Sequence, residues 1–161
     1  YRTTNQMLDS IALRTSNFIQ SQGYEALQIP ASQTLDRKRW RGTISHKMVA
    51  TQAGVGWIGK NALLITPQYG PRVRLVTVLT DAPLHTANPI IESRCGECQT
   101  CVEFCPPRAL LGVNWNVKLQ RKHLMQVNLC AKETRRNEKL VGNWICGVCI
   151  SVCPYGRKQL R

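Results

Sequence analysis

The residues best suited to chemistry are eight cysteines, all in the C-terminal part of the chain. The first run has the spacing C-x2-C-x2-C-x3-C-P and extends from Cys95 to Pro106. This spacing is typical of bacterial ferredoxins with two 4Fe–4S clusters, in which the fourth cysteine ligates the other cluster. The second run, C-x2-C-x3-C-P, extends from Cys146 to Pro154 and has one cysteine fewer. Cys130, sixteen residues before Cys146, is available to complete it.

This crossed pattern predicts two complete sets of thiolate ligands. We expect cluster 1 to bind Cys95, Cys98, Cys101 and Cys153. We expect cluster 2 to bind Cys105, Cys130, Cys146 and Cys149. Two zinc sites are the main alternative, because paired C-x2-C motifs also occur in zinc ribbons. A disulfide framework is a further alternative. Such frameworks usually stabilise chains that are too small to form a sufficient hydrophobic core, whereas the cysteine-free part here looks the better packed.

The chain is basic and rich enough in apolar residues to form a core. It has 161 residues, 43% of them hydrophobic, and a formal charge of +13. Two oxidised clusters with their eight thiolates would lower this charge to about +9. A basic surface favours anionic partners, so we expect an acidic electron-donor protein and consider tRNA or another nucleic acid. Basic residues cluster in two places, which are Lys132, Arg135, Arg136 and Lys139, and the tail Arg157, Lys158 and Arg161.

No apolar run is long enough to span a bilayer, so we expect no membrane segment. We also find no secretory signal at the start. Clustered cysteines without such a signal suggest a metal protein of the reducing cytoplasm that is handled anaerobically. The chain begins at Tyr1 without an initiator methionine, so we expect a fragment or a processed chain.

The pattern along the chain predicts an α+β portion over residues 1–91 and a ferredoxin-like module over residues 92–161. In the first portion we expect, in order, a helix at 4–22, a strand at 24–29, a polar loop at 31–44, a short helix at 45–53, and strands at 62–66 and 73–80. A turn rich in proline and glycine joins the last two strands, which suggests a hairpin. In the module we expect short helices after each cysteine run.

A glycine-rich turn, Gly54-x-Gly56-x-x-Gly59, matches the dinucleotide-binding fingerprint by letter. That fingerprint needs a strand before it and a helix after it, whereas a helix precedes and a strand follows here. The remaining interpretations are a tight turn that allows close packing, or a backbone that approaches another cofactor, with Lys60 offering a cation to it. His46 is a weak candidate for a proton donor, and a surface residue near a helix start is the alternative.

Three stretches together carry a family resemblance. They are Ala53-Gly54-Val55-Gly56-Trp57-Ile58-Gly59-Lys60, Leu63-Leu64-Ile65-Thr66-Pro67 and Leu79-Thr80-Asp81, followed by the double cysteine module. Over roughly residues 40–155 the chain resembles the epoxyqueuosine reductase family, and more distantly the cobalamin-dependent reductive dehalogenases. The resemblance implies a partial nitroreductase-like α/β portion that binds cobalamin, followed by the two-cluster module. It also implies that electrons pass through the clusters to cobalamin, which in the family drives removal of an epoxide oxygen from a tRNA base.

The chain departs from that family in the stretch before the glycine turn. The family has an Asp-x-x-Pro-like segment there, with the aspartate as the proposed proton donor. The matching stretch here, residues 41–47, has no carboxylate, and Asp36 is the nearest acid. Much of the family's N-terminal domain and its C-terminal repeats have no counterpart in this sequence. The sequence therefore resembles a shorter branch whose substrate it does not identify.

Three functions from different classes fit these observations. The first is an iron–sulfur oxidoreductase like epoxyqueuosine reductase, with two 4Fe–4S clusters and cobalamin as a further cofactor. The second is a non-enzymatic electron carrier or reductive activator that docks on a partner protein. The third is a basic RNA-binding protein in which the clusters are structural. Cobalamin titration separates the first from the second, and salt-dependent RNA binding tests the third.

Overall fold

The computed structural model describes residues 2–36 and 41–156, where the chain is a mixture of helices and small antiparallel sheets. The elements in chain order are α1 (Arg2–Ser21), β1 (Ala26–Ile29), α2 (His46–Gln52), β2 (Trp57–Ile58), β3 (Leu64–Ile65), β4 (Thr77–Thr80), α3 (Thr100–Glu103), the 3₁₀ helix η1 (Arg121–His123), α4 (Val127–Val141) and α5 (Val148–Ser151). Part of the predicted loop 31–44 and the basic tail Arg157, Lys158 and Arg161 lie outside the described residues. None of the helices in the described part could cross a membrane.

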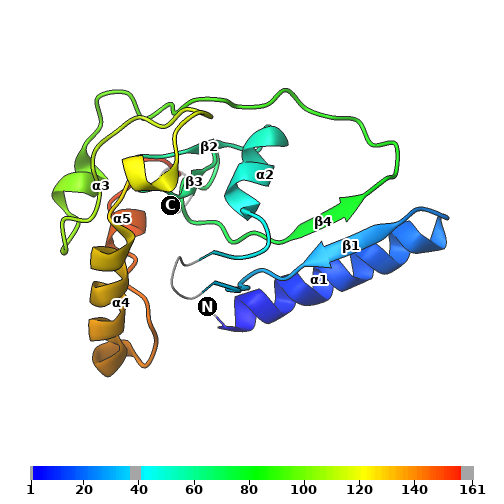
Figure 1. The fold of residues 1–161 in the computed structure, drawn as a ribbon, viewed down its shortest axis with the longest axis horizontal. Coiled ribbons are helices and arrows are strands. Elements are labelled where there is room, and N and C mark those ends of the chain that lie inside the picture. Colours follow the sequence, from blue (N-terminus) through cyan, green and yellow to red (C-terminus); the bar gives the residue numbers. More distant parts are fainter. Residues whose placement is uncertain (1, 37–40, 157–161) are drawn as a thin grey trace.

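The N-terminal portion is a two-stranded sheet covered by one long helix. Strands β1 and β4 pair antiparallel, with Ala26 opposite Thr80, and α1 lies along them (Figure 1). The predicted first helix and first strand are therefore confirmed. The apolar stripe of α1 is only partly used, however. Ala12 is buried against the sheet, whereas Met7, Ile11 and Phe18, on the other side of the stripe, are more than half exposed.

The expected hairpin between residues 62–66 and 73–80 is wrong. Strand β3 pairs with β2, with Trp57 opposite Ile65, and β4 pairs with β1 instead. Between β3 and β4 the chain closes a tight turn, marked by an isolated bridge between Thr66 and Gly70. After this turn the chain reaches β1, so β3 and β4 belong to two separate sheets.

Helix α2 and the β2–β3 hairpin form the centre of the molecule. The predicted cap is confirmed, because the Ser45 hydroxyl accepts a hydrogen bond from the Met48 amide at 3.4 Å. Successive residues of a strand point to opposite faces. Trp57 accordingly packs with Ile65 and Cys153, whereas Ile58 packs with Trp115 and Leu124 in a second cluster, listed in full as Ile58, Ala62, Trp115 and Leu124. Both core clusters join residues from the two sides of the predicted boundary at residue 91.

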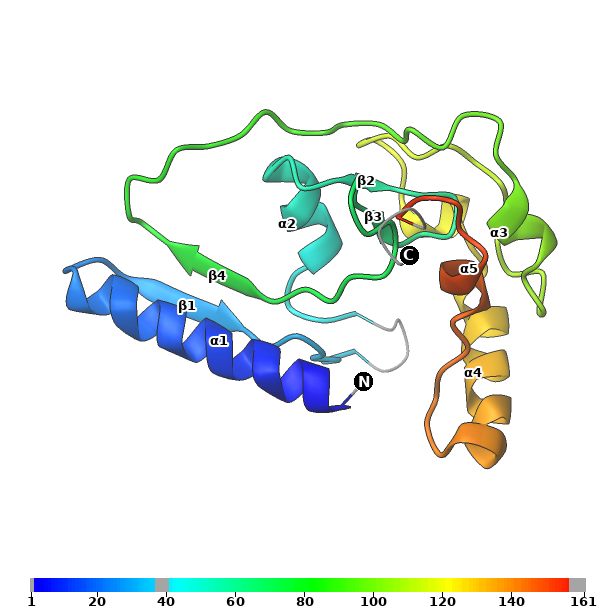
Figure 2. The same cartoon turned by 180° about the vertical axis from the view of Figure 1, so that it is seen from behind.

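The C-terminal part contains the short helices α3 and α5, which lie inside the two cysteine runs and not after them as expected. The fifteen-residue helix α4 was not predicted, and it replaces the short helices expected there. It ends at Gly142, whose left-handed φ of 68° suits glycine at this position. Figure 2 shows α5 near the N-terminal end of α4, and residues 81–93 running as a long extended segment from β4 towards α3.

Candidate functional site

Four cysteines surround a small enclosed space, which we call the first thiol cavity. Its lining residues are Lys60, Asn61, Ile65, Cys95, Cys98, Cys101, Cys153, Pro154 and Tyr155. Burial, and then the neighbouring thiols of Cys95, Cys153 and Cys98, raise the pKa of Cys101 to about 11. Neighbouring thiolates repel one another, so these thiols ionise less readily than isolated ones. A cationic metal core among them would offset that repulsion and bind the cysteines as thiolates.

The other four cysteines line a larger space of about 350 Å³, the second thiol cavity. They are Cys105, Cys130, Cys146 and Cys149, and they come from the end of the first run, from α4, and from the start of the second run. Burial first, then the surrounding thiols, raises the pKa of Cys149 to about 12. The structure therefore groups the cysteines into the two sets that the crossed pattern predicts, and their assignment as ligands stays a prediction.

Among the described residues, no three His, Cys, Asp or Glu side chains lie close enough to bind a single metal ion. Such closeness is not required by a 4Fe–4S cluster, because each thiolate binds a different iron at the corners of the cubane. The donor set of four thiols around each cavity fits such a cluster.

Two buried polar residues after the glycine turn support the thiol cavities. The Lys60 ammonium donates a hydrogen bond to the Gly96 carbonyl at 2.8 Å, inside the first cysteine run. The Asn61 amide donates to the Cys149 carbonyl at 3.4 Å, and Asn61 lines both thiol cavities. Lys60 and Asn61 are only 3% and 4% exposed. In this structure Lys60 therefore lies beside the cysteines and holds one of their loops.

The glycines of the turn are crowded by the protein itself. A Cβ atom on Gly56 would lie 2.1 Å from the Ile65 carbonyl oxygen, and one on Gly59 would lie 2.7 Å from the Ile65 side chain. Gly54 has a left-handed φ of +67° and would meet the Asn88 carbonyl oxygen at 2.9 Å. This geometry supports the packing interpretation of the turn.

Arg72 ties the end of the cysteine module to the N-terminal portion. Its guanidinium donates hydrogen bonds to the carbonyls of Tyr155 at 2.8 Å, Ser151 at 3.1 Å and Cys153 at 3.2 Å. One of these carbonyls belongs to Cys153, which lines the first thiol cavity, and the other two lie two residues before and after it. Arg72 thus positions the backbone on which Cys153 depends.

A third space, of about 620 Å³, opens beside α2, and we call it the α2 cavity. Its lining residues are Arg41, Gly42, Thr43, Ile44, Ser45, His46, Lys47, Met48, Ile58, Ala62, Trp115, Leu119, Gln120, Arg121 and Leu124. Gly54, Gly56, Gly59 and Lys60 are not among them. The α2 cavity shares Lys47, Ala62 and Arg121 with the second thiol cavity.

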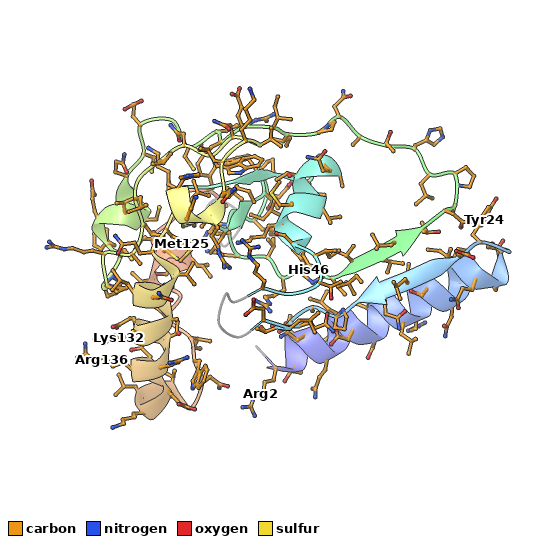
Figure 3. The ribbon with its side chains drawn as sticks, in the orientation of Figure 1. Arg2, Tyr24, His46, Met125, Lys132 and Arg136 are labelled. Carbon is orange, nitrogen blue, oxygen red and sulfur yellow. The ribbon has the colours of Figure 1, made fainter. Side chains whose placement is uncertain are left out.

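His46 lies at the start of α2, close to β4 (Figure 3). Its Nδ1 is 2.7 Å from the Thr77 hydroxyl and its Nε2 is 3.0 Å from the Pro30 carbonyl oxygen. The carbonyl can only accept, so Nε2 carries a proton and donates it to Pro30. With both nitrogens engaged, His46 connects α2 to the N-terminal sheet, and its proposed role as a proton donor stays a prediction.

Sequence reasoning missed four residues of this region, which are Lys47, Asn61, Arg72 and Arg121. Asn61 and Arg72 each neighbour a motif that was recognised, the glycine turn and the Gly70–Pro71 turn. Their positions next to these turns were the available signal. Lys47 and Arg121 carried no local signal, because only the fold brings α2 and η1 together at one cavity.

Comparison with known proteins agrees with this geometry. Residues 94–156 match the family described as the 4Fe-4S double cluster binding domain, so this part of the chain is a domain for two 4Fe–4S clusters. Over a wider range the chain is similar to epoxyqueuosine reductases. It is 40% identical over 120 residues to that of Listeria monocytogenes, covering 72% of this chain and 31% of the relative. It is 37% identical over 119 residues to that of Bacillus anthracis, covering 72% and 30%.

Solved structures show the same relationship. An epoxyqueuosine reductase crystallised with a tRNA-Tyr epoxyqueuosine-modified tRNA stem loop has a TM-score of 0.69 and 25% identity, over 96% of this chain and 39% of that one. The catabolic reductive dehalogenase NpRdhA shares the fold, with a TM-score of 0.64 and 22% identity over 88% and 20% of the two chains. The predicted resemblance is confirmed, and the chain spans about a third of the length of these reductases.

Proposed function

We propose that this chain is the electron-transfer part of an iron–sulfur oxidoreductase that resembles epoxyqueuosine reductase. The observation that carries the proposal is the sequence of adjoining cavities. The two thiol cavities share Asn61, and the second thiol cavity shares Lys47, Ala62 and Arg121 with the α2 cavity. An electron acceptor in the α2 cavity would lie next to the second set of cysteines, with the first set behind it.

The residues of the chain hold and shield this arrangement. When bound, each 4Fe–4S cluster supplies a one-electron carrier of low potential. Cys95, Cys98, Cys101 and Cys153 would hold one cluster, and Cys105, Cys130, Cys146 and Cys149 the other. Lys60 and Asn61 fix two of the ligand loops and bring donor groups to buried positions. The Trp57 and Tyr155 rings pack edge to face with their centroids 5.0 Å apart, and Trp57 also packs with Cys153 beside the first thiol cavity.

The acceptor suggested by the resemblance is cobalamin, bound by a nitroreductase-like α/β portion. The neighbouring reductive dehalogenases support this proposal, since one of their structures is described with B12-dependent dehalogenation. The α2 cavity has the volume of a site for a drug-sized ligand, roughly 300–1,000 Å³. Cobalamin is much larger than that, so only one part of the molecule would fill this cavity.

A second candidate function is binding of tRNA. The formal charge of +13 and the neighbouring reductase solved with a tRNA stem loop favour it. Binding through phosphates should weaken steeply with salt. The non-enzymatic carrier remains the alternative if neither cobalamin nor RNA binds.

The proposed electron donor is an acidic protein of the cytoplasm that docks on α4. Lys132, Arg135, Arg136 and Lys139 are exposed on this helix, and Figure 3 shows Lys132 and Arg136 extending from it. The same helix carries Cys130, which lines the second thiol cavity. A negatively charged donor would therefore be steered to the outer side of one ligand helix.

The proposed function is tested by anaerobic purification followed by metal, sulfide and paramagnetic resonance analysis. We expect about eight iron and eight sulfide per chain and two signals on chemical reduction, as two cubanes require. The reduced protein should then pass electrons to added cobalamin. Two zinc ions without labile sulfide would refute the cluster assignment, and fully reduced clusters that never reoxidise with cobalamin would refute the acceptor.

A further inference from the structure

A buried lysine forms part of the wall of the first thiol cavity. Lys60 is 3% exposed and lines this cavity together with the four cysteines of the first set. A lysine is almost never fully buried unless its charge has a partner. The Lys60 ammonium donates to the Gly96 carbonyl at 2.8 Å, a neutral group that accepts the hydrogen bond without cancelling the charge. Among the described residues that line the cavity there is no aspartate or glutamate.

A tight turn holds Lys60 in this position. The Gly59 amide donates to the Leu63 carbonyl at 2.9 Å, and the Ala62 amide donates to the Gly59 carbonyl at 2.8 Å. A Cβ atom on Gly59 would lie 2.7 Å from the Ile65 side chain, so the backbone here has little room to move. The positive charge is therefore fixed beside the cysteines.

A fixed positive charge beside an iron–sulfur cluster affects its reduction. An oxidised 4Fe–4S core with four thiolates carries a net charge of about −2, and reduction adds another negative charge. A buried cation interacts with these charges more strongly than a cation in water does, because water screens them poorly there. The cation stabilises the more negative, reduced state, and the reduction potential rises.

We propose that Lys60 is a potential-setting residue, whose buried ammonium stabilises the reduced state of the cluster in the first thiol cavity. The inference rests on the proposed function in one respect, which is that a 4Fe–4S cluster occupies this cavity. Arg72 is a further cation near Cys153, but it is half-buried and does not line the cavity. Its guanidinium donates to three backbone carbonyls instead. Among the described lining residues, Lys60 is the one that brings a cation to the cavity itself.

The charge of Lys60 can be separated from its hydrogen bond. The exposed Asn114 side-chain amide donates to the same Gly96 carbonyl at 3.2 Å. The loop of the first cysteine run is thus held by one charged donor and one neutral donor. A substitution of Asn114 removes a hydrogen bond to this carbonyl and leaves the charge in place.

Anaerobic redox titration of the holoprotein, followed by paramagnetic resonance, tests the inference. The first cluster is identified as the one whose signal Cys98→Ala abolishes. Lys60→Gln keeps a hydrogen-bond donor and removes the charge, so reduction of this cluster should become about tenfold less favourable, a midpoint about 59 mV lower for one electron. The midpoint of the other cluster should stay unchanged. Lys60→Arg keeps the charge and should keep the wild-type midpoint, and Asn114→Ala should change neither cluster.

An unchanged midpoint in Lys60→Gln, an equal shift of both clusters, or the same shift in Asn114→Ala would overturn the inference. Loss of the first cluster from both Lys60→Gln and Lys60→Met would also overturn it, because Lys60 would then be needed for assembly. Reoxidation of the clusters by cobalamin tests the proposed function separately. Clusters that pass electrons on but show no shift in Lys60→Gln refute the role of Lys60 alone. A shift in clusters that never reoxidise with cobalamin refutes the proposed acceptor alone.

Discussion

Replacing Arg72 with glutamine should weaken the first cluster site without affecting the second. The substitution removes a guanidinium that donates to the carbonyls of Ser151, Cys153 and Tyr155. A hydrogen bond to a charged group contributes roughly 1.5–3 kcal/mol. Two of these contacts are longer than 3 Å and the three share one donor group, so we take about 3 kcal/mol for the whole set. This loss would make local opening around Cys153 about a hundredfold more frequent.

Anaerobic release of iron to a chelator measures that opening. In Arg72→Gln about half of the iron should leave in a phase accelerated by up to a hundredfold, while the other half keeps the wild-type rate. Paramagnetic resonance during the reaction should show that one signal disappears first. Arg74→Gln is the matched control, because Arg74 lies two residues away, is exposed and donates to the half-buried Asn5 side chain. Equal acceleration of all the iron, or the same effect in Arg74→Gln, would show that Arg72 does not act through Cys153.

Two further predictions concern the cysteines and helix α4. Cys105→Ala and Cys130→Ala should abolish the same paramagnetic resonance signal, and Cys153→Ala should abolish the other one. If Cys105→Ala and Cys153→Ala abolish the same signal, the crossed ligation is wrong. Lys132→Glu should slow reduction by an acidic ferredoxin several-fold at low salt, and a stopped-flow difference that persists at high salt would exclude electrostatic docking.

The elements with strong local signals were predicted from the sequence, and those that depend on distant contacts were not. The periodicity of residues 4–22 predicts α1, and Ser45 predicts the start of α2. The partner of β3 could not be predicted, because its two-residue pairing with β2 follows from the crowding of Gly56 against Ile65. The exposure of Met7 and Phe18 on α1 could not be predicted either, because an apolar stripe on a helix does not determine how much of it a two-stranded sheet covers.

Helix α4 escaped prediction for a physical reason. Its residues that line the second thiol cavity are mostly polar or small, and they are Val127, Cys130, Ala131, Glu133 and Thr134. None of the described residues of α4 is fully buried, so the helix contributes no large apolar side chain to a core. A local mark of its C-terminal end was Gly142. The cysteine spacing, in contrast, predicted how the eight thiols divide into two groups, although the helices between them were not predicted.

The glycine turn shows how a motif can serve a site without touching a ligand. Gly56 lets the β2 backbone approach Ile65 so closely that a Cβ atom would collide with its carbonyl oxygen. That approach fixes the hairpin, whose alternating faces direct Trp57 to Cys153 and Ile58 to the α2 cavity. The same hairpin carries Asn61 to the place where the two thiol cavities meet. A larger residue at position 56 would therefore disturb all three cavities together, and loss of ligand binding in such a variant would follow from the hairpin, whether or not the glycines contact the ligand.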